Sequence, residues 1–484
     1  MGDLFSAEGW LNTTLASVGD AIWTYILIGV LVAGALWFTV RSKGLQFRHL
    51  GEMFRVLGRS GIGEKDTKTR ISAFQAFSVS MATRVGTGNL AGVATAITIG
   101  GPGAVFWMWI MAIFGSSLSF VESTLAQIFK KKEKESFIGG PAYYIRKGLN
   151  CKWMAALFAV LIIVNFGMAN NSIQANTICS ALHGAFGIKP LLAGLALSAL
   201  TLVIIFGGIH RISNVSSVIV PIMALGYMAL ALFILCRHID MIPQVFSLIF
   251  KDAFGIREVA GGGIGVTIMT GIRRGLFSNE AGEGSVPNVA ATADISHPVK
   301  QGFIQALGVF VDTLVVCSCT AFIILFSGVD LGSGVSGIKL TQAALFNEIG
   351  RTGPVFITIA VFLFAFSTII GNYYYMEANV RYLTQKRGVL FVFRLLSGCV
   401  FVLFGAAASL DLVWTVGDLC MALQTLVNLV ALFLLGRYAL RALRDYNEQK
   451  RRGIANPVFT RDQMPELNLE CWETPAEVPA PRNE

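Results

Sequence analysis

Charged side chains are scarce in this chain. Of its 484 residues, 14% are Asp, Glu, Lys or Arg and 54% are apolar, and the mean hydropathy is +0.64. Soluble proteins contain about 25% charged residues, so the composition excludes a water-soluble globular protein. It also excludes a disordered chain, which combines low hydrophobicity with high net charge.

Cysteine pairs and catalytic motifs are missing as well. The eight cysteines show no C-x-x-C spacing and mostly lie in or beside apolar segments, which excludes a disulfide scaffold and indicates small packing residues. The chain has neither the His-Glu-x-x-His motif of zinc enzymes nor the Gly-x-x-x-x-Gly-Lys-Ser/Thr loop of nucleotide-driven pumps. We therefore expect no enzyme activity and no cofactor. The net charge is +9, but the cations stand between apolar segments rather than on one basic face, so we expect no nucleic-acid partner. We also expect no obligatory protein partner.

Long apolar runs are what the chain has in abundance. Runs of about 20 apolar residues are long enough to cross a bilayer as helices. The sequence predicts an all-α polytopic membrane protein with eleven transmembrane helices: Ala21–Val40, Ile71–Ile99, Gly103–Ala126, Trp153–Phe186, Leu191–Gly208, Val215–Cys236, Val259–Ala291, Phe303–Ser327, Val355–Tyr382, Val389–Ala408 and Leu412–Leu435.

The distribution of cations predicts the orientation of these helices. The first 40 residues contain no Lys or Arg, so no signal peptide is expected and the N-terminus should face outside. With eleven spans, the inward-facing segments then hold 29 of the 38 Lys and Arg residues and the outward-facing ones six; Arg84, Arg273 and Arg274 are embedded. This asymmetry follows the positive-inside rule and predicts a plasma membrane protein, in bacteria of the inner membrane, with a cytoplasmic C-terminus.

Two segments outside the spans have their own character. Ile242–Phe254 places apolar residues at near-helical spacing, which indicates either an amphipathic helix on the outer membrane surface or a loop helix packed on the bundle. Residues 437–484 become charged and Pro-rich, which predicts a loosely ordered cytoplasmic tail.

Two predicted spans, the second and the seventh, are interrupted by glycine and polar residues. The interruptions are Arg84–Gly92 and Gly271–Gly282. Irregular backbone is tolerated inside a bilayer only where it is buried in protein or lines a cavity. The two breaks lie in the second and seventh spans, which are five spans apart. Because five is an odd number, these two helices cross the membrane in opposite directions, as in an inverted repeat.

This repeat divides the chain into four parts. They are an N-terminal segment with an accessory helix (1–40), a cytoplasmic loop and first five-helix repeat (41–258), an inverted five-helix repeat (259–436) and the tail (437–484).

An unwound helix exposes main-chain N–H groups at one end and carbonyls at the other, which suits an anion beside a cation. A zwitterionic amino acid with Na⁺ fits that description. Side chains that could complete the pocket without an unpaired charge are Thr87, Asn89, Gln174 and Asn176. Two alternatives remain open: glycines that pack helices closely, and Gln174 or Asn176 as interhelical hydrogen bonds.

Four strings give the chain a family resemblance. They are GTGNLAG (Gly86–Gly92), GGPGAVFWMW (Gly100–Trp109), GPAYY (Gly140–Tyr144) and GLFSNEAG (Gly275–Gly282). In these residues, and across most of its length, the sequence resembles the sodium:alanine/glycine symporters. The resemblance implies a LeuT-type 5+5 inverted repeat over spans 2–11, preceded by one extra helix, and import of small neutral amino acids with Na⁺.

The resemblance also implies site residues. A Na⁺ site would use Ser367 and Thr368 with backbone oxygens near Thr83 and Gly86, and the substrate pocket would fall on Asn89, Gln174, Ser278, Asn279 and Thr368. We add Thr87 and Gly88 from the first break, and Asn372. The expected substrate-binding set is then Thr87, Gly88, Asn89, Gln174, Ser278, Asn279, Thr368 and Asn372.

Two positions depart from the family pattern. Asn372 stands where a Trp is common, which predicts a wider or more polar pocket that also admits glutamine. Arg84 stands where relatives carry a small or hydroxyl residue, and we expect it to pair with Asp312, as a functional group or as a structural ion pair.

The sequence therefore predicts a secondary active symporter that works by alternating access. The first alternative is coupling to protons through Asp312, Glu122 or Glu280. A channel and an intramembrane enzyme are further alternatives, the latter without a recognisable metal or nucleophile constellation.

Overall fold

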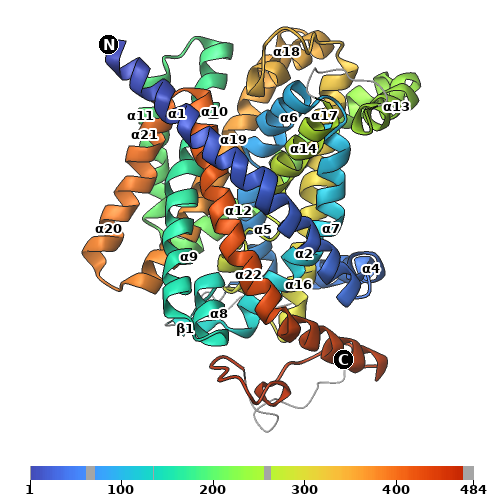
Figure 1. The fold of residues 1–484 in the computed structure, drawn as a ribbon, viewed down its shortest axis with the longest axis vertical. Coiled ribbons are helices and arrows are strands. Elements are labelled where there is room, and N and C mark those ends of the chain that lie inside the picture. The colour runs from blue at the N-terminus through green and yellow to red at the C-terminus, as the bar shows by residue number, and fades with distance from the viewer. Residues whose placement is uncertain (1, 61–70, 134–135, 256–262, 473–484) are drawn as a thin grey trace.

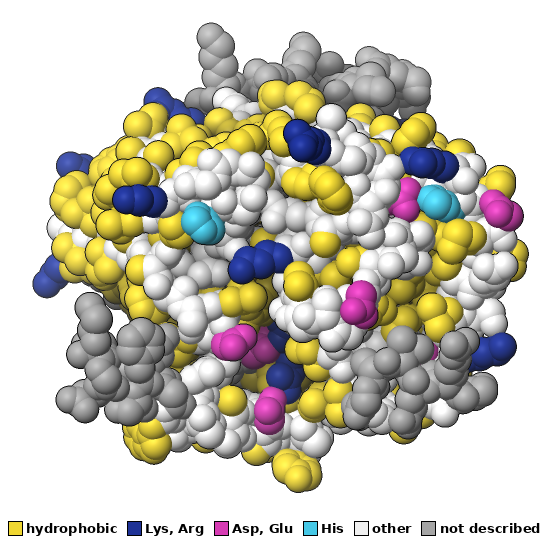
Figure 2. All heavy atoms as spheres, turned by 90° about the horizontal axis from the view of Figure 1, so that it is seen from above, with side chains coloured by type: hydrophobic (Ala, Val, Ile, Leu, Met, Phe, Trp, Pro, Cys, Tyr) yellow, Lys and Arg dark blue, Asp and Glu magenta, His cyan; other side chains and the backbone are white. Residues whose placement is uncertain are grey.

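The computed structural model describes residues 2–60, 71–133, 136–255 and 263–472, and these ranges form a bundle of long helices (Figure 1). The strands in this part of the chain are a short antiparallel hairpin, β1 (Lys131–Glu133) and β2 (Ser136–Ile138), in which Lys131 pairs with Ile138. On the face that carries α13 and α18, Lys and Arg side chains are scattered singly (Figure 2).

The helices of the N-terminal half cover the predicted spans, but the first begins at Gly2 instead of Ala21, and α12 begins at Gly208 instead of Val215. Their bounds are α1 (Gly2–Ile22), a π-helical turn (Trp23–Leu27), α2 (Ile28–Arg41), α3 (Leu45–Arg48), α4 (Leu50–Ser60), α5 (Ala73–Arg84), the π-helical turn η2 (Gly88–Gly92), α6 (Val93–Gly100), α7 (Ala104–Ile128), α8 (Pro141–Gly148), α9 (Lys152–Val164), the π-helical turn η3 (Asn165–Asn170), α10 (Asn171–Phe186), α11 (Pro190–Ile205), α12 (Gly208–Arg237), a 3₁₀ turn (Ile239–Met241) and α13 (Ile242–Ala253).

The C-terminal half continues in the same way. Its elements are α14 (Gly263–Asn279), α15 (Pro287–Ala290), α16 (Pro298–Val309), the π-helical stretch η5 (Phe310–Cys317), α17 (Ser318–Phe326), α18 (Gly337–Ile349), α19 (Thr352–Leu383), α20 (Arg387–Leu395), the π-helical turn η6 (Leu396–Val400), α21 (Phe401–Ala407), α22 (Leu410–Arg451) and a 3₁₀ turn (Arg461–Gln463).

Eight helical stretches in the described ranges are long and apolar enough to cross a membrane. They are Asn12–Arg41, Ala104–Ile128, Lys152–Phe186, Gly208–Arg237, Pro298–Phe326, Thr352–Leu383, Arg387–Ala407 and Leu410–Arg451. The remaining three predicted spans coincide with helices that are short or interrupted: α5 with α6, α11, and α14 with α15. The prediction of a polytopic helical membrane protein is confirmed.

Helix α19 lies at the centre of the bundle. Every residue from Phe364 to Val380 is buried, and the helix contacts α5, α9, α10, α12 and α18. The buried stretch nevertheless contains Ser367, Thr368, Asn372 and Glu377. A buried polar group is costly unless it is hydrogen-bonded. The polar residues of α19 therefore need hydrogen-bond partners on neighbouring helices or in a bound ligand.

The prediction of a loosely ordered tail is wrong for residues 437–472. Helix α22 continues to Arg451, and beyond it Phe459, Met464 and Trp472 are buried. The Phe459 N–H donates to the Ser296 carbonyl at 2.9 Å. These apolar side chains cover the ends of α7 and α16, a contact that proline content alone does not reveal; residues 473–484 lie outside the described ranges.

Helix α13 is a loop helix packed on the bundle, the second of the two alternatives for this segment. Val245 and Ile249 are buried, the Trp107 indole N–H donates to the Ala253 carbonyl at 3.2 Å, and the Asp252 carboxylate accepts from the Gly103 N–H at 2.7 Å. The expected boundary between the two repeats, at 258/259, lies outside the described residues.

Candidate functional site at two helix breaks

The first predicted break is present between α5 and η2. The helix is interrupted at Val85 and Gly86, where Val85 has φ −79° and ψ 78°. The Gly86 N–H donates to the Arg84 carbonyl and to Asn89 Oδ1, both at 2.9 Å. The chain then resumes as π-helix from Gly88. The main chain of this break is therefore held by its own residues and by neighbouring side chains, as buried irregular backbone requires.

The second break is also present, but it lies further along the chain than predicted. Gly271 to Asn279 are helical, and the unwound stretch begins at Glu280, a non-glycine residue with φ +55°. It passes Gly282 and Gly284, which also have positive φ. The placement at Gly271–Gly282 is therefore wrong in its first part.

Gly271 and Gly275 serve packing instead. A Cβ on Gly275 would stand 3.3 Å from Met108 Cα and Met111 Cβ of α7. This is the close-packing alternative for glycines in membrane helices.

The helical residues that flank the two breaks touch each other in the interior of the protein. A Cβ on Gly88 would stand 3.2 Å from Ser278 Cα, so the two main chains approach as closely as glycine allows. Asp312, in η5, joins them: its carboxylate accepts from Asn89 Nδ2 at 2.6 Å and from Ser278 Oγ at 2.7 Å. Asp312 is fully buried. Thr313 Oγ1 donates to the same carboxylate at 2.9 Å.

Arg84 does not pair with Asp312, so that prediction is wrong. Its guanidinium donates to the Gln305 carbonyl at 3.1 Å and to Ser119 Oγ at 2.9 Å. In the structure, α5 directs Arg84 toward α7 and α16, whereas Asn89 and Ser278 already occupy the carboxylate of Asp312. Arg84 thus anchors the end of α5 to its neighbours.

A third wall of the site comes from η3, α10 and α19. Gln174 Oε1 accepts from the Thr87 N–H at 3.1 Å, and Gln174 Nε2 donates to Asn170 Oδ1 at 2.9 Å. Asn372 Nδ2 donates to Asn170 Oδ1 at 3.1 Å and to Asn171 Oδ1 at 3.0 Å. Sequence reasoning missed Asn170 and Asn171.

Two oxygens near this wall are buried without a hydrogen-bond partner among the described residues: Asn372 Oδ1 and Thr87 Oγ1. A buried polar atom left unsatisfied costs about 1–3 kcal/mol. These two oxygens are therefore available to a bound molecule or ion.

The four residues of the expected Na⁺ set are only partly brought together. Thr368 Oγ1 contacts the Ala82 carbonyl at 2.8 Å, and a Cβ on Gly86 would collide with this hydroxyl. Thr83 Oγ1 lies 2.7 Å from the Tyr375 hydroxyl. Ser367 Oγ donates to the Phe364 carbonyl at 2.8 Å and faces Met223 of α12. Gly86 and Thr368 thus meet, whereas Thr83 and Ser367 turn to other partners.

Two further predicted residues have structural partners. Asn279 Nδ2 donates to Thr313 Oγ1 at 3.2 Å, and its Oδ1 accepts from the Ala281 N–H at 3.0 Å, so Asn279 holds the start of the second break. Asn176 Nδ2 donates to the carbonyls of Gly405 and Ala408, both at 2.9 Å. Asn176 therefore joins α10 to the end of α21, as its interhelical alternative predicted.

Buried acids support the second break. Glu122 of α7 accepts from the Gly282 N–H at 3.2 Å, the Gly284 N–H at 3.1 Å and Asn428 Nδ2 at 2.9 Å. Glu283 accepts from Asn165 Nδ2 at 2.8 Å. Sequence reasoning named Glu122 only as a proton acceptor. An acid inside the apolar run of α7 was the available signal for this supporting role.

The model of the sodium:alanine symporter family matches residues 8–461. The chain belongs to this family. It is 51% identical to a probable sodium/glutamine symporter, GlnT of Bacillus subtilis, over 96% of each chain, and 47% identical to the amino-acid carrier protein AlsT of the same organism, over 96% of this chain and 98% of AlsT. Symporter family members are transporters and not enzymes.

The chain is also similar to a third relative and, in its fold, to a solved transporter structure. The sodium/proton-dependent alanine carrier protein of Bacillus sp. PS3 is 36% identical over 84% of this chain and 95% of its own. A manganese transporter of Eremococcus coleocola superposes with a TM-score of 0.52 at 13% identity, covering 82% of this chain and 84% of that one. At such low identity the likeness concerns the fold alone.

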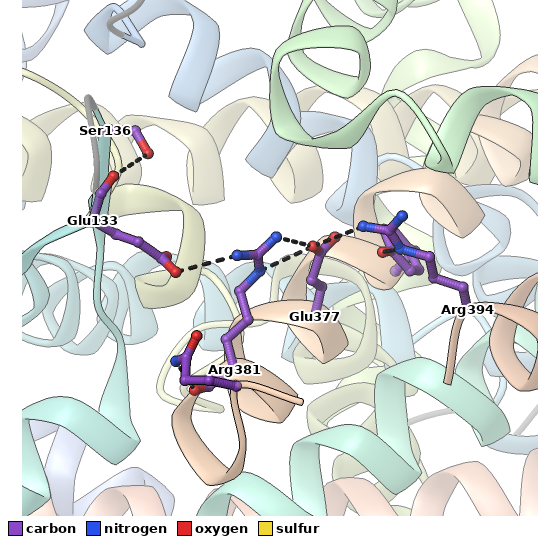
Figure 3. A network of polar contacts seen from close by, with 7 residues as sticks. Glu133, Ser136, Glu377, Arg381 and Arg394 are labelled. Carbon is purple, nitrogen blue, oxygen red and sulfur yellow. Dashed lines mark hydrogen bonds and ion pairs between the residues drawn. The ribbon is translucent and has the colours of Figure 1, made fainter. Parts of the chain in front are cut away.

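Ion pairs flank the two breaks of this symporter-family chain. In the last third of α14, before the second break, Arg274 pairs with Asp418 of α22, and its guanidinium lies 4.5 Å from the centre of the Trp414 ring. Toward the end of α19, Glu377 binds Arg381 at 2.6 Å and Arg394 at 3.2 Å (Figure 3). Charged contacts thus connect different helices at both ends of the polar centre.

Proposed function

We propose that this protein is a sodium-coupled symporter that imports small neutral amino acids, with substrate and Na⁺ bound together at the two breaks. The observation that supports it most is that residues flanking both breaks, Asn89 and Ser278, meet at Asp312. Beside it, the buried main chain of Gly86–Gly88 contacts Thr368, Ser278, Asn89 and Gln174.

The chemistry of these groups suits the two proposed ligands. Na⁺ is a hard cation and favours oxygen ligands such as hydroxyls, carbonyls and carboxylates. The carboxylate of an amino acid suits main-chain N–H groups at the start of a half-helix. The buried Asp312 supplies negative charge that a bound cation would balance. The proposed substrate set remains Thr87, Gly88, Asn89, Gln174, Ser278, Asn279, Thr368 and Asn372. From the expected Na⁺ set we propose Gly86 and Thr368, which meet, and we add Asp312 as a cation ligand. Thr83 and Ser367 are not carried into the proposal, because their hydroxyls face other partners.

The proposed architecture is eleven spans with a LeuT-type 5+5 inverted repeat over spans 2–11. It is supported by two interrupted helices that meet at one point and by the fold shared with a solved transporter at TM-score 0.52. Alternating access would follow from rocking of one helix group against the other around the breaks. The positive-inside pattern supports a plasma membrane orientation with the N-terminus outside and the C-terminus in the cytoplasm.

The energetics make concentrative uptake feasible. A potential of 100 mV contributes about 2.3 kcal/mol per charge, and a tenfold Na⁺ gradient about 1.4 kcal/mol. One coupled ion therefore supports roughly several-hundredfold accumulation.

The proposed substrates are alanine, glycine and glutamine. Relatives named as alanine and glutamine carriers support this range. The unpartnered Asn372 Oδ1 would accept a hydrogen bond from a substrate amide, which favours glutamine among them.

Uptake into proteoliposomes tests the coupling. We expect radiolabelled substrate to accumulate with inward Na⁺ and to stop accumulating when choline replaces it. Undiminished uptake in choline would refute sodium coupling.

Proton coupling is the second candidate, and it is favoured by one observation: Asp312, Glu122 and Glu280 are buried carboxyl groups at the centre of the site. Under this alternative, collapse of a pH gradient by an ionophore would abolish uptake even with Na⁺ present. Under the sodium proposal, uptake persists.

A further inference from the structure

Two cavities adjoin at the end of the molecule that carries α8 and the β-hairpin, remote from the breaks. We call the first the hairpin cavity; its volume is about 520 Å³, and its lining includes Lys131, Lys132, Arg146, Lys147 and Glu470. We call the second the α20 cavity; its volume is about 650 Å³, and its lining includes Arg387, Leu390, Phe391 and Arg394. Both are lined by Glu133, Arg381 and Gln385, so they share one wall.

That shared wall is an ion-pair chain. Arg381 lies between Glu133 at 3.2 Å and Glu377 at 2.6 Å, and Arg394 lies beyond Glu377 (Figure 3). The chain connects the hairpin to the end of α19 and the start of α20. The acids at the cavities are therefore already neutralised: Glu133 and Glu377 by these arginines, and Glu470 by Lys147 at 2.9 Å.

Four lining cations have no ion pair within the part of the chain that the structure describes. They are Lys131, Lys132, Arg146 and Arg387. The Arg146 guanidinium also has a buried nitrogen without a hydrogen-bond partner among the described residues. Among the described residues, positive charge thus remains unbalanced on both sides of the wall, and such a cavity attracts an anion with several acceptor oxygens, above all a phosphate.

The α20 cavity adds an apolar surface beside these cations. Leu390 and Phe391 line it, and Phe391 is 50% exposed. No residue of α20 is buried, and α20 opens a stretch long and apolar enough to cross a membrane, Arg387–Ala407. The cavity therefore lies where a membrane-crossing helix begins, with cations at the level of lipid headgroups and apolar side chains continuing along the helix.

We propose that the joined cavities bind the phosphate headgroup of an anionic phospholipid. The phosphate lies in the α20 cavity against Arg387, the cations of the hairpin cavity attract it across the shared wall, and the acyl chains lie along Leu390 and Phe391. A soluble phosphate compound offers the same oxygens but lacks the chains, which distinguishes it from the proposed ligand.

Native mass spectrometry of the full-length protein in detergent tests this, with phosphatidylglycerol, phosphatidylcholine and glycerol phosphate as probes. We expect wild-type protein to retain phosphatidylglycerol and to release the other two. The triple substitution Lys132→Gln, Arg146→Gln and Arg387→Gln removes three cations. Since each cation near a membrane surface is worth a factor of about five in affinity, binding should fall roughly a hundredfold.

A matched control removes the same charge elsewhere. Lys189→Gln, Lys339→Gln and Arg351→Gln change exposed residues that line neither cavity, and this variant should retain the lipid like wild type. The single variant Arg387→Gln, at an exposed position, should weaken binding about fivefold even if the triple variant cannot be purified. Equal retention of phosphatidylglycerol by wild type and either cavity variant would overturn the site. Equal binding of glycerol phosphate or phosphatidylcholine would overturn an anionic lipid as its ligand.

Discussion

The two helix breaks are held open by different chemistry. The first is short, at Val85 and Gly86, and its N–H groups meet neutral amide oxygens of Asn89 and Gln174. The second runs from Glu280 to the start of α15, and its N–H groups at Gly282 and Gly284 meet the carboxylate of Glu122. One carboxyl group thus serves two N–H groups of the second break, whereas at the first break each N–H group has an amide oxygen of its own.

The difference separates a scaffold from a binding surface. The N–H groups of Gly282 and Gly284 are already bound by a carboxylate. Near the first break, Thr87 Oγ1 and Asn372 Oδ1 lack partners among the described residues. We infer that ligands bind mainly against the first break, whereas the second is fixed in advance by α7. Three substitutions test this inference.

The largest effect is expected from Glu122→Ala. It leaves three donors without their acceptor, the N–H groups of Gly282 and Gly284 and Asn428 Nδ2. At about 1–3 kcal/mol for each buried unsatisfied group, the free energy of unfolding should fall by about 3 kcal/mol or more. Thermal unfolding of purified protein measures the loss.

The adjacent Ser123→Ala is the control for this substitution. Ser123 is buried, and its Oγ has no hydrogen-bond partner among the described residues, so stability should change little. Equal stability of the Glu122→Ala variant and wild type would mean that the second break does not depend on this carboxylate.

A smaller, ligand-specific effect is expected from Thr368→Val, which keeps the shape of the side chain and removes the hydroxyl beside Gly86 and the Ala82 carbonyl. The Na⁺ concentration for half-maximal uptake should rise about tenfold, equivalent to roughly 1.4 kcal/mol, while thermal stability stays near that of wild type.

Ser367→Ala sharpens the comparison, since Ser367 Oγ faces Phe364 and Met223 rather than the break. Its Na⁺ dependence should shift much less. If Ser367→Ala had the larger effect, the ion would bind on the α12 side of α19 and not at the first break.

The sequence predicted the first break because its polar residues interrupt an otherwise apolar run. It misplaced the second break because glycine has two uses in a membrane helix: Gly271 and Gly275 admit the side chains of α7, while Gly282 and Gly284 adopt positive φ. Only the packing of α7 against α14 distinguishes them.

Long-range contacts could not be predicted either, because they also depend on how distant helices pack. Asn89 and Asp312 are 223 positions apart, and nothing in a single sequence specifies that η5 turns the carboxylate of Asp312 toward Asn89 rather than toward Arg84. The amide cluster of Asn170, Asn171 and Asn372 likewise needs η3, α10 and α19 in place. Spacing along one helix could reveal Gln174, but not its partners.

The most subtle test concerns substrate size at the first break. Asn372→Trp replaces a small amide by an indole beside Asn170 and Asn171, which should narrow the range toward alanine and glycine. Competition by glutamine should weaken about fivefold relative to competition by alanine, or about 1 kcal/mol. Because both competitors are measured on one preparation, the ratio is independent of how much protein folds.

Ser397→Ala is the control that distinguishes the size of the side chain at residue 372 from a general disturbance of the hydrogen bonds around Asn171. It removes the hydroxyl that accepts from Asn171 Nδ2 at 2.9 Å but leaves residue 372 unchanged, so the ratio of glutamine to alanine competition should stay at the wild-type value. If Asn372→Trp also left that ratio unchanged, residue 372 would not limit substrate size. Ligand selection would then have to come from the side of Ser278 and Asp312, against the view that the second break is only a scaffold.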